Sequence, residues 1–359
     1  MKKLFLTGIV WLKLGTSFSQ TAITPLQYTC FKTNQALQID GKLDESAWQK
    51  ASWTSLFVDI EGNKKPLPTQ ATKAKMLWDD HYLYIAAELE EQHIWAYQTT
   101  KDQIVYLEND FEVFIDPDGD SQNYFELEVN AANNTFDLFL PKPYRNGGNA
   151  LINWDMKNLK TAVYLEGTLN QAKDTDKRWT VEIAIPFSSL SMDNQVHLPQ
   201  DKSFWRINFS RVEWDYSLEA GKYSRKKKAN GQGVLPEYNW VWSPQGAINM
   251  HLPERWGYLV FSTQPVGTSP SPFTLPESEQ VKQLAWEIYD KQQSYFAKNQ
   301  HYANELSLLN WDKETAKTSD YVFAIEATKQ TFLLSVSDKT HKTILTLNQD
   351  SVLKWVNGF

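Results

Sequence analysis

Apolar and polar residues alternate along short runs of the chain, and turn-forming residues separate these runs. Between Tyr28 and Phe261 the runs include LYIAAEL, FEVFID, FELEVN, FDLFL, TVEIAI, WRINFSRVEW and WGYLVF. A period of two places successive side chains on opposite faces of a strand, whereas few segments here keep the 3.6-residue period of a helix. The pattern predicts a mainly β fold, and specifically an antiparallel β-sandwich.

The last part of the chain has a different pattern. Residues 263–276 are rich in Ser, Thr, Pro and Gly, which predicts a linker. Apolar residues from Val281 to Phe296 then follow a helical stripe, and the runs YVFAIEA, TFLLSVS, KTILTL and SVLKWV predict four short strands. We therefore expect the sandwich to span 20–262 and a small α+β domain of unknown partner to span 277–359.

The N-terminus predicts export. It carries two lysines, an apolar run and a small-residue end, which is typical of a signal peptide over residues 1–19 and places the protein in the periplasm, on the cell surface or outside the cell. The mature chain has no run long enough to predict a transmembrane segment. The single cysteine, Cys30, cannot form an internal disulfide, so the core alone must stabilise the fold.

Net charge and aromatic content indicate which class of binding partner to expect. A net charge of −7 argues against nucleic acid, because a phosphate-binding surface is normally basic. The basic run at 225–228 predicts a solvated loop, and a contact with an anion or polyanion is the alternative. The 15 Trp, 16 Tyr and 18 Phe are a heavy aromatic load, and exported proteins often place such rings against sugars, although many of them must pack in the core. A polysaccharide or oligosaccharide partner is therefore expected.

One predicted hairpin is rich in acids. The stretch ENDFEVFIDPDGDSQNYFELEVN, residues 108–130, carries eight carboxylates, with turn formers between its two strands. At period two the apolar residues share one face and most acids share the other. Registers that keep the apolar faces together put Glu112 beside Glu126 or Glu128. Like charges in such positions destabilise a sheet by roughly 0.2 to 1 kcal/mol per pair, unless a cation, a proton or a ligand lies between them.

Three interpretations of this acidic face are open. In the first, the acids and Asn130 accept hydrogen bonds from sugar hydroxyls, beside an aromatic platform. In the second, the face is solvated or structurally paired, with Arg145 or Arg211 neutralising it. In the third, Glu112 and Glu128 are a glycoside hydrolase pair at the roughly 5 Å separation that retaining enzymes use.

Two further segments offer ligands. Alternate carboxylates at Asp116, Asp118 and Asp120 are similar to the first half of a calcium loop, although the later Gly and Glu of such a loop are missing and a plain acidic turn is the alternative. The turn-rich segment 141–155 presents Tyr144, Arg145 and Trp154, and loops carry recognition more often than strands do. A surface crossover with an incidental Arg is the alternative there.

Four motifs carry a resemblance to a known family. LQIDGKLDESAW, KMLWDDHYLYIAAEL, ENDFEVFIDPDGD and ERWGYLVF occur in this order. Together they resemble the family 9 carbohydrate-binding modules, specifically the longer exported relatives that occur as free-standing proteins. The resemblance implies a β-sandwich that binds sugar ends between aromatic rings, with calcium of structural use. It does not cover residues 262–359.

The family's binding residues carry over in part. The resemblance places the acid that touches sugar hydroxyls at Glu112 and the first sandwiching ring at Tyr106. It places the family's Arg at Glu128 and its second Trp near Met250, so these two positions depart from the family. Another loop would have to supply the missing ring, and the candidates are Trp240, Trp242 and Trp154.

The sequence thus predicts an exported, non-catalytic protein that recognises a glycan in polysaccharide breakdown or capture. The alternatives are a glycoside hydrolase that uses Glu112 and Glu128, and a structural envelope protein that binds no sugar. The predicted ligand-binding residues lie on the acidic hairpin and on nearby loops and are Tyr106, Asp110, Glu112, Glu128, Asn130, Tyr144, Arg145, Trp154 and Trp242. The predicted calcium ligands are Asp116, Asp118 and Asp120.

Overall fold

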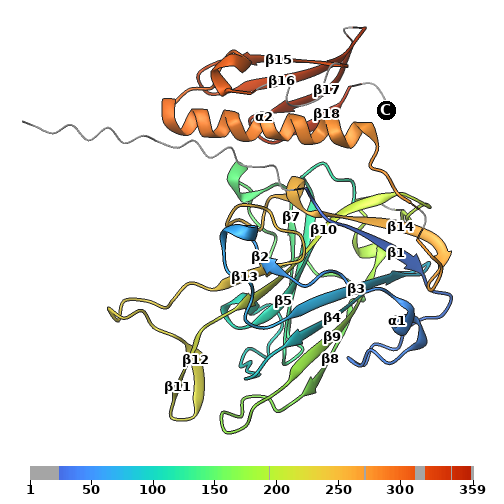
Figure 1. Ribbon diagram of the computed structural model, residues 1–359, viewed down its shortest axis with the longest axis vertical. Helices are drawn as coiled ribbons and strands as arrows, with labels where there is room; N and C mark the ends of the chain where they lie inside the picture. Colours follow the sequence, from blue (N-terminus) through green and yellow to red (C-terminus); the bar gives the residue numbers. More distant parts are fainter. Residues whose placement is uncertain (1–23, 194, 271, 312–319, 341, 357–359) are drawn as a thin grey trace, which may run out of the picture.

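The computed structural model describes residues 24–193, 195–270, 272–311, 320–340 and 342–356. The predicted signal peptide, residues 1–19, lies outside these ranges. Within them, no helix combines the length and the apolar character that crossing a membrane requires. Figure 1 shows a large curled sheet with a small unit of one long helix and a second sheet above it.

The large sheet contains twelve strands. They are β1 (Gln27–Lys32), β2 (Val58–Asp59), β3 (Thr72–Trp78), β4 (Tyr82–Glu90), β5 (Asp110–Asp116), β6 (Tyr124–Asn130), β7 (Thr135–Leu140), β8 (Lys160–Glu166), β9 (Arg178–Pro186), β10 (Phe204–Glu213), β13 (Tyr238–Val241) and β14 (Gly257–Pro265). Shorter elements join them, namely α1 (Ser46–Lys50), the hairpin β11 (Tyr216–Glu219) and β12 (Lys222–Arg225), and the 3₁₀ turns η1 (Gly62–Lys64), η2 (Val105–Leu107), η3 (Tyr144–Asn146), η4 (Phe187–Ser189) and η5 (Pro253–Arg255).

The sheet folds over itself to form a sandwich. Its main strand order is β7-β6-β5-β10-β14-β1-β3-β4-β9-β8, and β13 and β2 continue from β10. One hydrophobic core combines side chains from both ends of this order, such as Phe111 and Leu127 with Ile85 and Val181. The predicted mainly β sandwich is confirmed.

One strand departs from the antiparallel prediction. Strand β1 runs parallel to both of its neighbours, β14 and β3, whereas the other pairs of the large sheet are antiparallel. Strand β1 comes first in the chain but lies between β14, the last strand of this sheet in the chain, and β3. It therefore joins the two layers of the sandwich. Cys30 lies in this strand as a buried free thiol.

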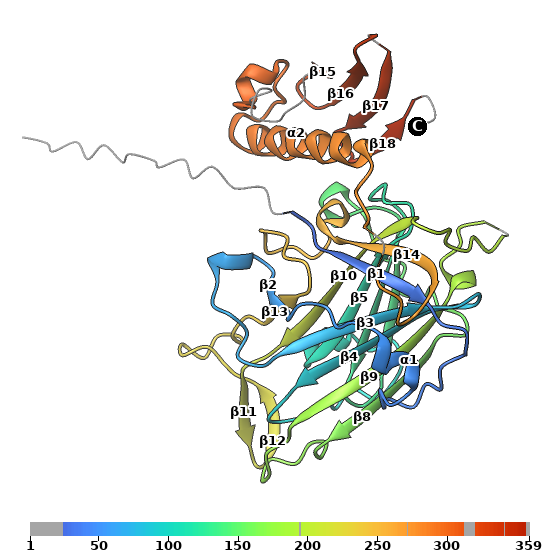
Figure 2. The same cartoon turned by 45° about the vertical axis from the view of Figure 1, so that its right-hand side comes forward.

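The C-terminal unit, here called the tail domain, has the predicted α+β composition. It contains α2 (Glu277–Asn299), η6 (Leu306–Leu309), β15 (Tyr321–Ala327), β16 (Phe332–Asp338), β17 (Thr343–Asn348) and β18 (Leu353–Trp355). The strands pair in chain order as an antiparallel sheet. Its own core includes Ile288, Tyr289, Leu334 and Leu345, and Figure 2 shows α2 lying between this sheet and the sandwich.

Candidate functional site

The acidic residues of the β5–β6 hairpin form a tight group, as the alternation predicted. Glu112 lies directly opposite Glu128 in the antiparallel register, and Phe114 lies opposite Glu126. One carboxylate oxygen from each of Asp110, Glu112 and Glu128 lies within 4.8 Å of the other two. We call Asp110, Glu112, Glu126 and Glu128 the acidic cluster.

The acidic cluster is buried although it faces away from the main core. Asp110 is 0% exposed and Glu112, the most exposed of the four, is 5% exposed. The reason is a second apolar layer, in which Phe114 and Tyr124 of the hairpin pack with Val105 of η2 and with Trp256. Apolar surroundings make a charge costly unless a partner compensates it.

Few groups of the protein compensate these carboxylates. The backbone N–H of Tyr106 donates a 2.9 Å hydrogen bond to Glu128. Asp110 Oδ2 and Glu126 Oε2 are buried and have no hydrogen-bond partner in the part of the chain that the structure describes. Within the described residues, no lysine or arginine forms an ion pair with any of the four. The second interpretation, in which Arg145 or Arg211 neutralises the face, is therefore wrong.

Burial changes the protonation of the acidic cluster. Desolvation raises the pKa of Glu112 to about 7. It also raises the pKa values of Asp110, Glu126 and Glu128 well above their usual range, and the neighbouring carboxylates raise them further. Protons therefore populate the cluster near neutral pH, and a protonated carboxyl can donate as well as accept a hydrogen bond.

Two half-exposed tyrosines flank the acidic cluster. Tyr106 of η2 is 40% exposed and Tyr144 of η3 is 45% exposed. Burial and then Glu128 raise the pKa of Tyr106, whereas burial and then Glu126 raise the pKa of Tyr144 to about 12. The rings thus lie within electrostatic reach of the acids and still present surface to solvent, which suits the stacking of a sugar ring.

His251 supports one of these rings. Its ring centroid lies 4.5 Å from that of Tyr144, and its Nδ1 is hydrogen-bonded to the Tyr124 hydroxyl at 3.1 Å. Burial lowers the pKa of His251 to about 4, so the imidazole is neutral at physiological pH. His251 therefore fixes Tyr144 without bringing a positive charge to the acids.

The predicted tryptophans lie elsewhere. Trp242 is 2% exposed and packs in the main core against Phe209, with ring centroids 6.0 Å apart. Trp154 packs against Phe125, at 5.2 Å, on the core side of the hairpin. Trp240 is also buried in the main core. The expectation that one of them supplies a second ring is corrected, because Trp240 and Trp242 are buried and Trp154 packs against the main core. The local sequence does not show which side of the sheet a ring after or between strands will cover.

Two predicted polar residues have structural partners. The guanidinium of Arg145 makes two hydrogen bonds to Glu254, at 2.6 and 3.0 Å, and lies over rings of α2 rather than over the acids. The Asn130 side chain accepts hydrogen bonds from the N–H groups of Ala132 and Asn134 and donates to Gln98, so it closes the turn after β6. Of the predicted ligand-binding residues, the structure brings together Tyr106, Asp110, Glu112, Glu128 and Tyr144.

The predicted calcium ligands converge. One oxygen each from Asp116, Asp118 and Asp120 lies within 4.8 Å of the others. Both oxygens of buried Asp116 accept backbone N–H groups, from Gly119 and Ser121, at 2.9 Å. Burial and then Asp118 raise the pKa of Asp120 to about 6. Three converging hard oxygens fit the donor set of Ca²⁺, although the turn also stabilises itself through its own hydrogen bonds.

Sequence reasoning missed a third group of acids. Asp102, Asp137 and Asp155 converge, but the Lys101 ammonium lies among them, 2.9 Å from Asp137 and 3.0 Å from Asp102, and also bonds Asp155. Lys101 occupies the place that a cation would take. Glu126 and His251 were also left out of the predicted site, although the alternation already placed Glu126 on the acidic face.

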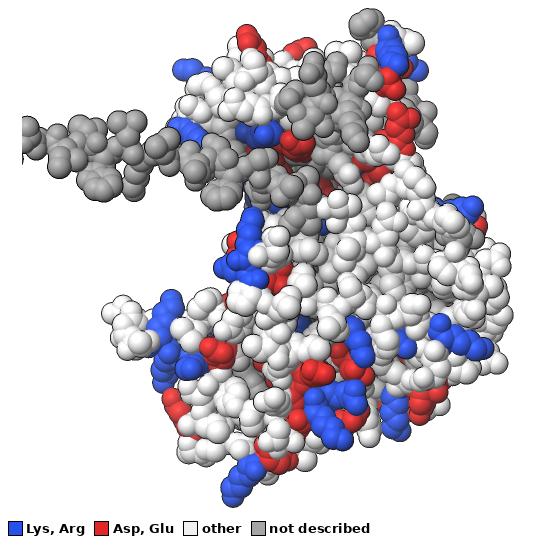
Figure 3. All heavy atoms as spheres, viewed as in Figure 1, with Lys and Arg blue, Asp and Glu red and all other residues white. Residues whose placement is uncertain are grey.

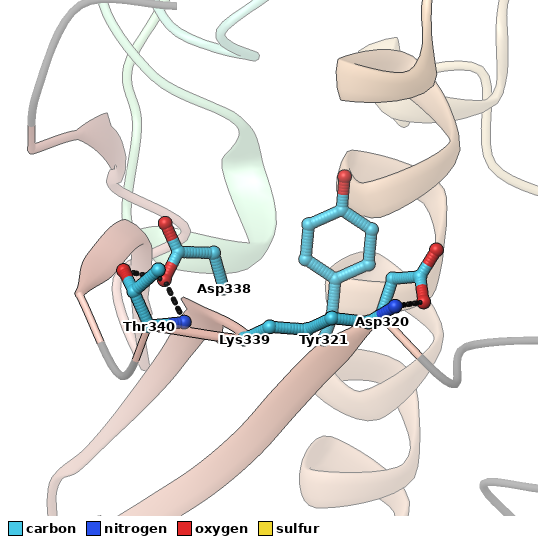
Figure 4. A pocket seen from close by; sticks show the side chains of 5 residues that line it. All are labelled: Asp320, Tyr321, Asp338, Lys339 and Thr340. Carbon is cyan, nitrogen blue, oxygen red and sulfur yellow. Dashed lines mark hydrogen bonds and ion pairs between the residues drawn. The ribbon is translucent and has the colours of Figure 1, made fainter.

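The basic run and a hollow in the tail domain are weaker candidates for a ligand site. The three lysines of the basic run, residues 226–228, lie in the exposed loop after β12, as predicted, whereas Arg225 ends β12 and lies over the Trp214 ring. Figure 3 shows basic residues on the part of the surface that projects beside the sandwich. The tail domain has a hollow of about 260 Å³. Figure 4 shows the side chains that line it, which are Asp320, Tyr321, Asp338, Lys339 and Thr340. There Lys339 pairs with Asp320, and Asp338 accepts hydrogen bonds from Thr340. The charged groups of this hollow thus have partners within the protein.

The fold and the site together define a β-sandwich protein with a buried acidic cluster between two half-exposed tyrosines. Residues 39–204 match the model of the carbohydrate family 9 binding domain-like family. The match confirms the predicted resemblance for that segment.

Two curated relatives carry a similar segment. One is Exoglucanase XynX from Acetivibrio thermocellus, which is 27% identical over 156 residues, and the other is Endo-1,4-beta-xylanase A from Thermoanaerobacterium saccharolyticum, which is 29% identical over 158 residues. Each match covers 44% of this chain but only 12% and 11% of those two proteins, respectively. This chain therefore shares only a small part of the length of these two enzymes.

Solved structures show weaker likeness. A candidate carbohydrate-binding protein from Bacteroides uniformis has a TM-score of 0.49 at 14% identity, over 67% of this chain and 100% of that one. A family 9 carbohydrate-binding module from Caldicellulosiruptor kristjanssonii in complex with cellotriose has a TM-score of 0.41 at 14% identity, over 69% and 100%. At these scores neither structure defines the site of this chain.

Proposed function

We propose that this protein binds a glycan on the acidic face of the β5–β6 hairpin, with Tyr106 and Tyr144 as aromatic walls and Glu112, Glu126 and Glu128 as the polar groups between them. The observation that carries the proposal is the acidic cluster itself, four buried carboxyls without a cation from the described residues. The family match over 39–204 supports a sugar as the ligand. Sugar hydroxyls donate and accept hydrogen bonds, which suits carboxyls that share protons.

The proposal includes export and a part in polysaccharide breakdown or capture. Its support is the N-terminal pattern of residues 1–19 and the occurrence of a similar segment in an exoglucanase and an endo-xylanase. Calcium at Asp116, Asp118 and Asp120 belongs to the same proposal as a structural ion. It would raise the unfolding temperature when calcium is added, and Asp118→Asn would abolish that rise.

A glycan array probed with the full mature chain tests the proposal, followed by calorimetric titration of the best-binding glycan. Tyr106→Ala and Tyr144→Ala should each weaken binding roughly tenfold, because each removes one ring surface from the sugar. Tyr164→Ala is the matched control, since Tyr164 is 42% exposed on the distant edge strand β8. Equal binding by all three variants would refute this site.

Hydrolysis is the second candidate function, because carboxylate oxygens of Glu112 and Glu128 lie within 4.8 Å and the pKa of Glu112 is raised to about 7. A retaining glycosidase also needs one ionised carboxylate, whereas burial raises the pKa values of both residues. We therefore expect no turnover of aryl glycosides or of the array's best oligosaccharide between about pH 4 and 9. Turnover that disappears in both Glu112→Gln and Glu128→Gln would establish the enzyme instead.

A further inference from the structure

The single turn η3 contacts two different parts of the molecule. Tyr144 packs against His251, within electrostatic reach of Glu126 and Glu128, whereas the next two residues, Arg145 and Asn146, contact the tail domain. Consecutive residues of a 3₁₀ turn point in different directions, so one short segment can join a binding wall to a second domain. The position of Tyr144 therefore depends on what holds its two neighbours.

Arg145 is held from two sides. Its guanidinium makes a two-pronged contact with Glu254 of η5 and lies 5.4 Å from the ring centroid of Trp286 and 5.3 Å from that of Tyr289, both on α2. The side chain of Glu254 is 2% exposed. A buried bidentate ion pair that also lies over aromatic rings is a rigid arrangement.

Asn146 is held mainly by the tail domain, and its amide oxygen also accepts a 3.3 Å hydrogen bond from Arg145 Nε. Its amide nitrogen donates to the Tyr289 hydroxyl at 3.1 Å and to the carbonyl of Gln349 at 3.0 Å. Its amide oxygen accepts a 2.6 Å hydrogen bond from the Ser351 hydroxyl. These partners come from α2 and from the turn between β17 and β18.

The same helix also fixes the loop that carries His251. Arg255, in the adjoining η5, donates a 2.6 Å hydrogen bond to Asp290 of α2. Nearby, the Lys282 ammonium donates to the carbonyl of Gly119 at 2.7 Å, and the cavity left between α2 and the sandwich there is about 10 Å³. That space is about the size of a single water, so the two domains are closely packed.

We propose that the tail domain is a positioning element of the glycan site. It clamps Arg145 and Asn146 and thereby holds Tyr144 against His251, above the acidic cluster. The inference rests on the proposed function and adds a role for a domain outside the matched segment. Arg145 and Asn146 touch no sugar in this account, since both act through Tyr144.

The test uses the full mature chain and the double variant Arg145→Met/Glu254→Gln, which removes the clamp without leaving a buried charge unpaired. Amide exchange of Asn146 and Gly147, whose N–H groups close the η3 turn at 3.0 and 2.9 Å, should accelerate roughly tenfold. Affinity for cellotriose, or for the array's best glycan, should fall roughly tenfold. The control Arg178→Met/Glu166→Gln removes the 2.7 Å ion pair between β9 and the edge strand β8, together with the 3.1 Å contact of Arg178 with Glu88, and should change neither quantity.

A double-mutant cycle identifies Tyr144 as the link. In a Tyr144→Ala background, the clamp variant should change sugar affinity less than about twofold, because the ring that it positions is gone. Asn146→Ala should behave as a weaker clamp variant. The inference would be overturned if the clamp variant left the amide exchange of Asn146 and Gly147 or the sugar affinity unchanged. It would also be overturned if the clamp variant lost the same sugar affinity with and without Tyr144. If the wild-type chain binds no glycan, the proposed function fails as well, whereas glycan binding that ignores the clamp overturns the inference alone.

Discussion

Strand β10 separates two groups of buried acids. An arginine compensates one group, whereas no cation in the described part of the chain compensates the other. On the core side of β10, the fully buried Arg211 bonds Glu91 and Glu213, each at 2.8 Å, and also donates to Thr72. On the other side, Ser210 faces Glu112 across the β10–β5 pair, and no cation of the described residues reaches the acidic cluster. Elsewhere the fold supplies donors for the acids that it buries, as Arg211 does for Glu91 and Glu213 and as the N–H groups of Trp48 and Gly41 do for Glu182. Buried carboxyl oxygens that the described residues leave without such donors, as in the acidic cluster, indicate a partner from outside.

The largest expected effect breaks the compensated group. Arg211→Met would leave Glu91 and Glu213 buried without a cation and should lower the free energy of unfolding by about 3 to 5 kcal/mol. Urea unfolding at pH 7 measures this loss. Lys227→Met is the control, because its 3.2 Å pair with Glu219 is exposed and should contribute less than about 1 kcal/mol. A loss as small as the control's would mean that Arg211 does not compensate the two acids.

Removing one acid of the uncompensated group should have the opposite sign for stability. Glu112→Gln should raise the free energy of unfolding at pH 8 by about 2 kcal/mol, because ionised Glu112 is buried beside other carboxylates. The same variant should weaken glycan binding roughly ten- to a hundredfold. The two readouts together separate a ligand-binding acid from a structural one.

Glu182→Gln is the matched control for that variant. Its pKa is likewise raised to about 7 by burial, but it accepts hydrogen bonds from Trp48 Nε1 at 2.7 Å and from the N–H of Gly41 at 2.8 Å. This substitution should lower stability and leave glycan affinity unchanged. If Glu112→Gln bound the glycan as tightly as the wild-type protein, Glu112 would not belong to the site.

The pH dependence of stability sharpens the same contrast with a smaller effect. The pKa of Glu112 rises from 4.5 to about 7 on folding, so the folded state binds more protons between these values. The free energy of unfolding should therefore fall as pH rises from about 4.5 to 7, and the fall should be shallower in Glu112→Gln. Denaturant titrations at several pH values measure it. Identical slopes in the two proteins would show that Glu112 ionises normally.

Much of the sandwich and of the acidic cluster was predictable, because a period of two assigns faces and the apolar face sets the register. Glu112 opposite Glu128 follows from that rule. The position of Trp242 did not, because this residue follows the end of β13 and packs against Phe209 of β10 only in the folded sheet. Arg145 was misplaced for another reason, because its partner Glu254 lies 109 residues further along the chain and α2 docks only in the folded molecule.

The carboxyl signals of ¹³C-glutamate-labelled protein test the central claim most directly, namely that a glycan compensates the acids that the fold leaves unpaired. Saturation with the array's best glycan should shift the signals of Glu112, Glu126 and Glu128 and displace the pH midpoint of Glu112 from about 7. The signals of Glu91 and Glu213 should stay in place, because Arg211 already holds them. A glycan that binds and leaves the acidic-cluster signals unchanged would contradict the account.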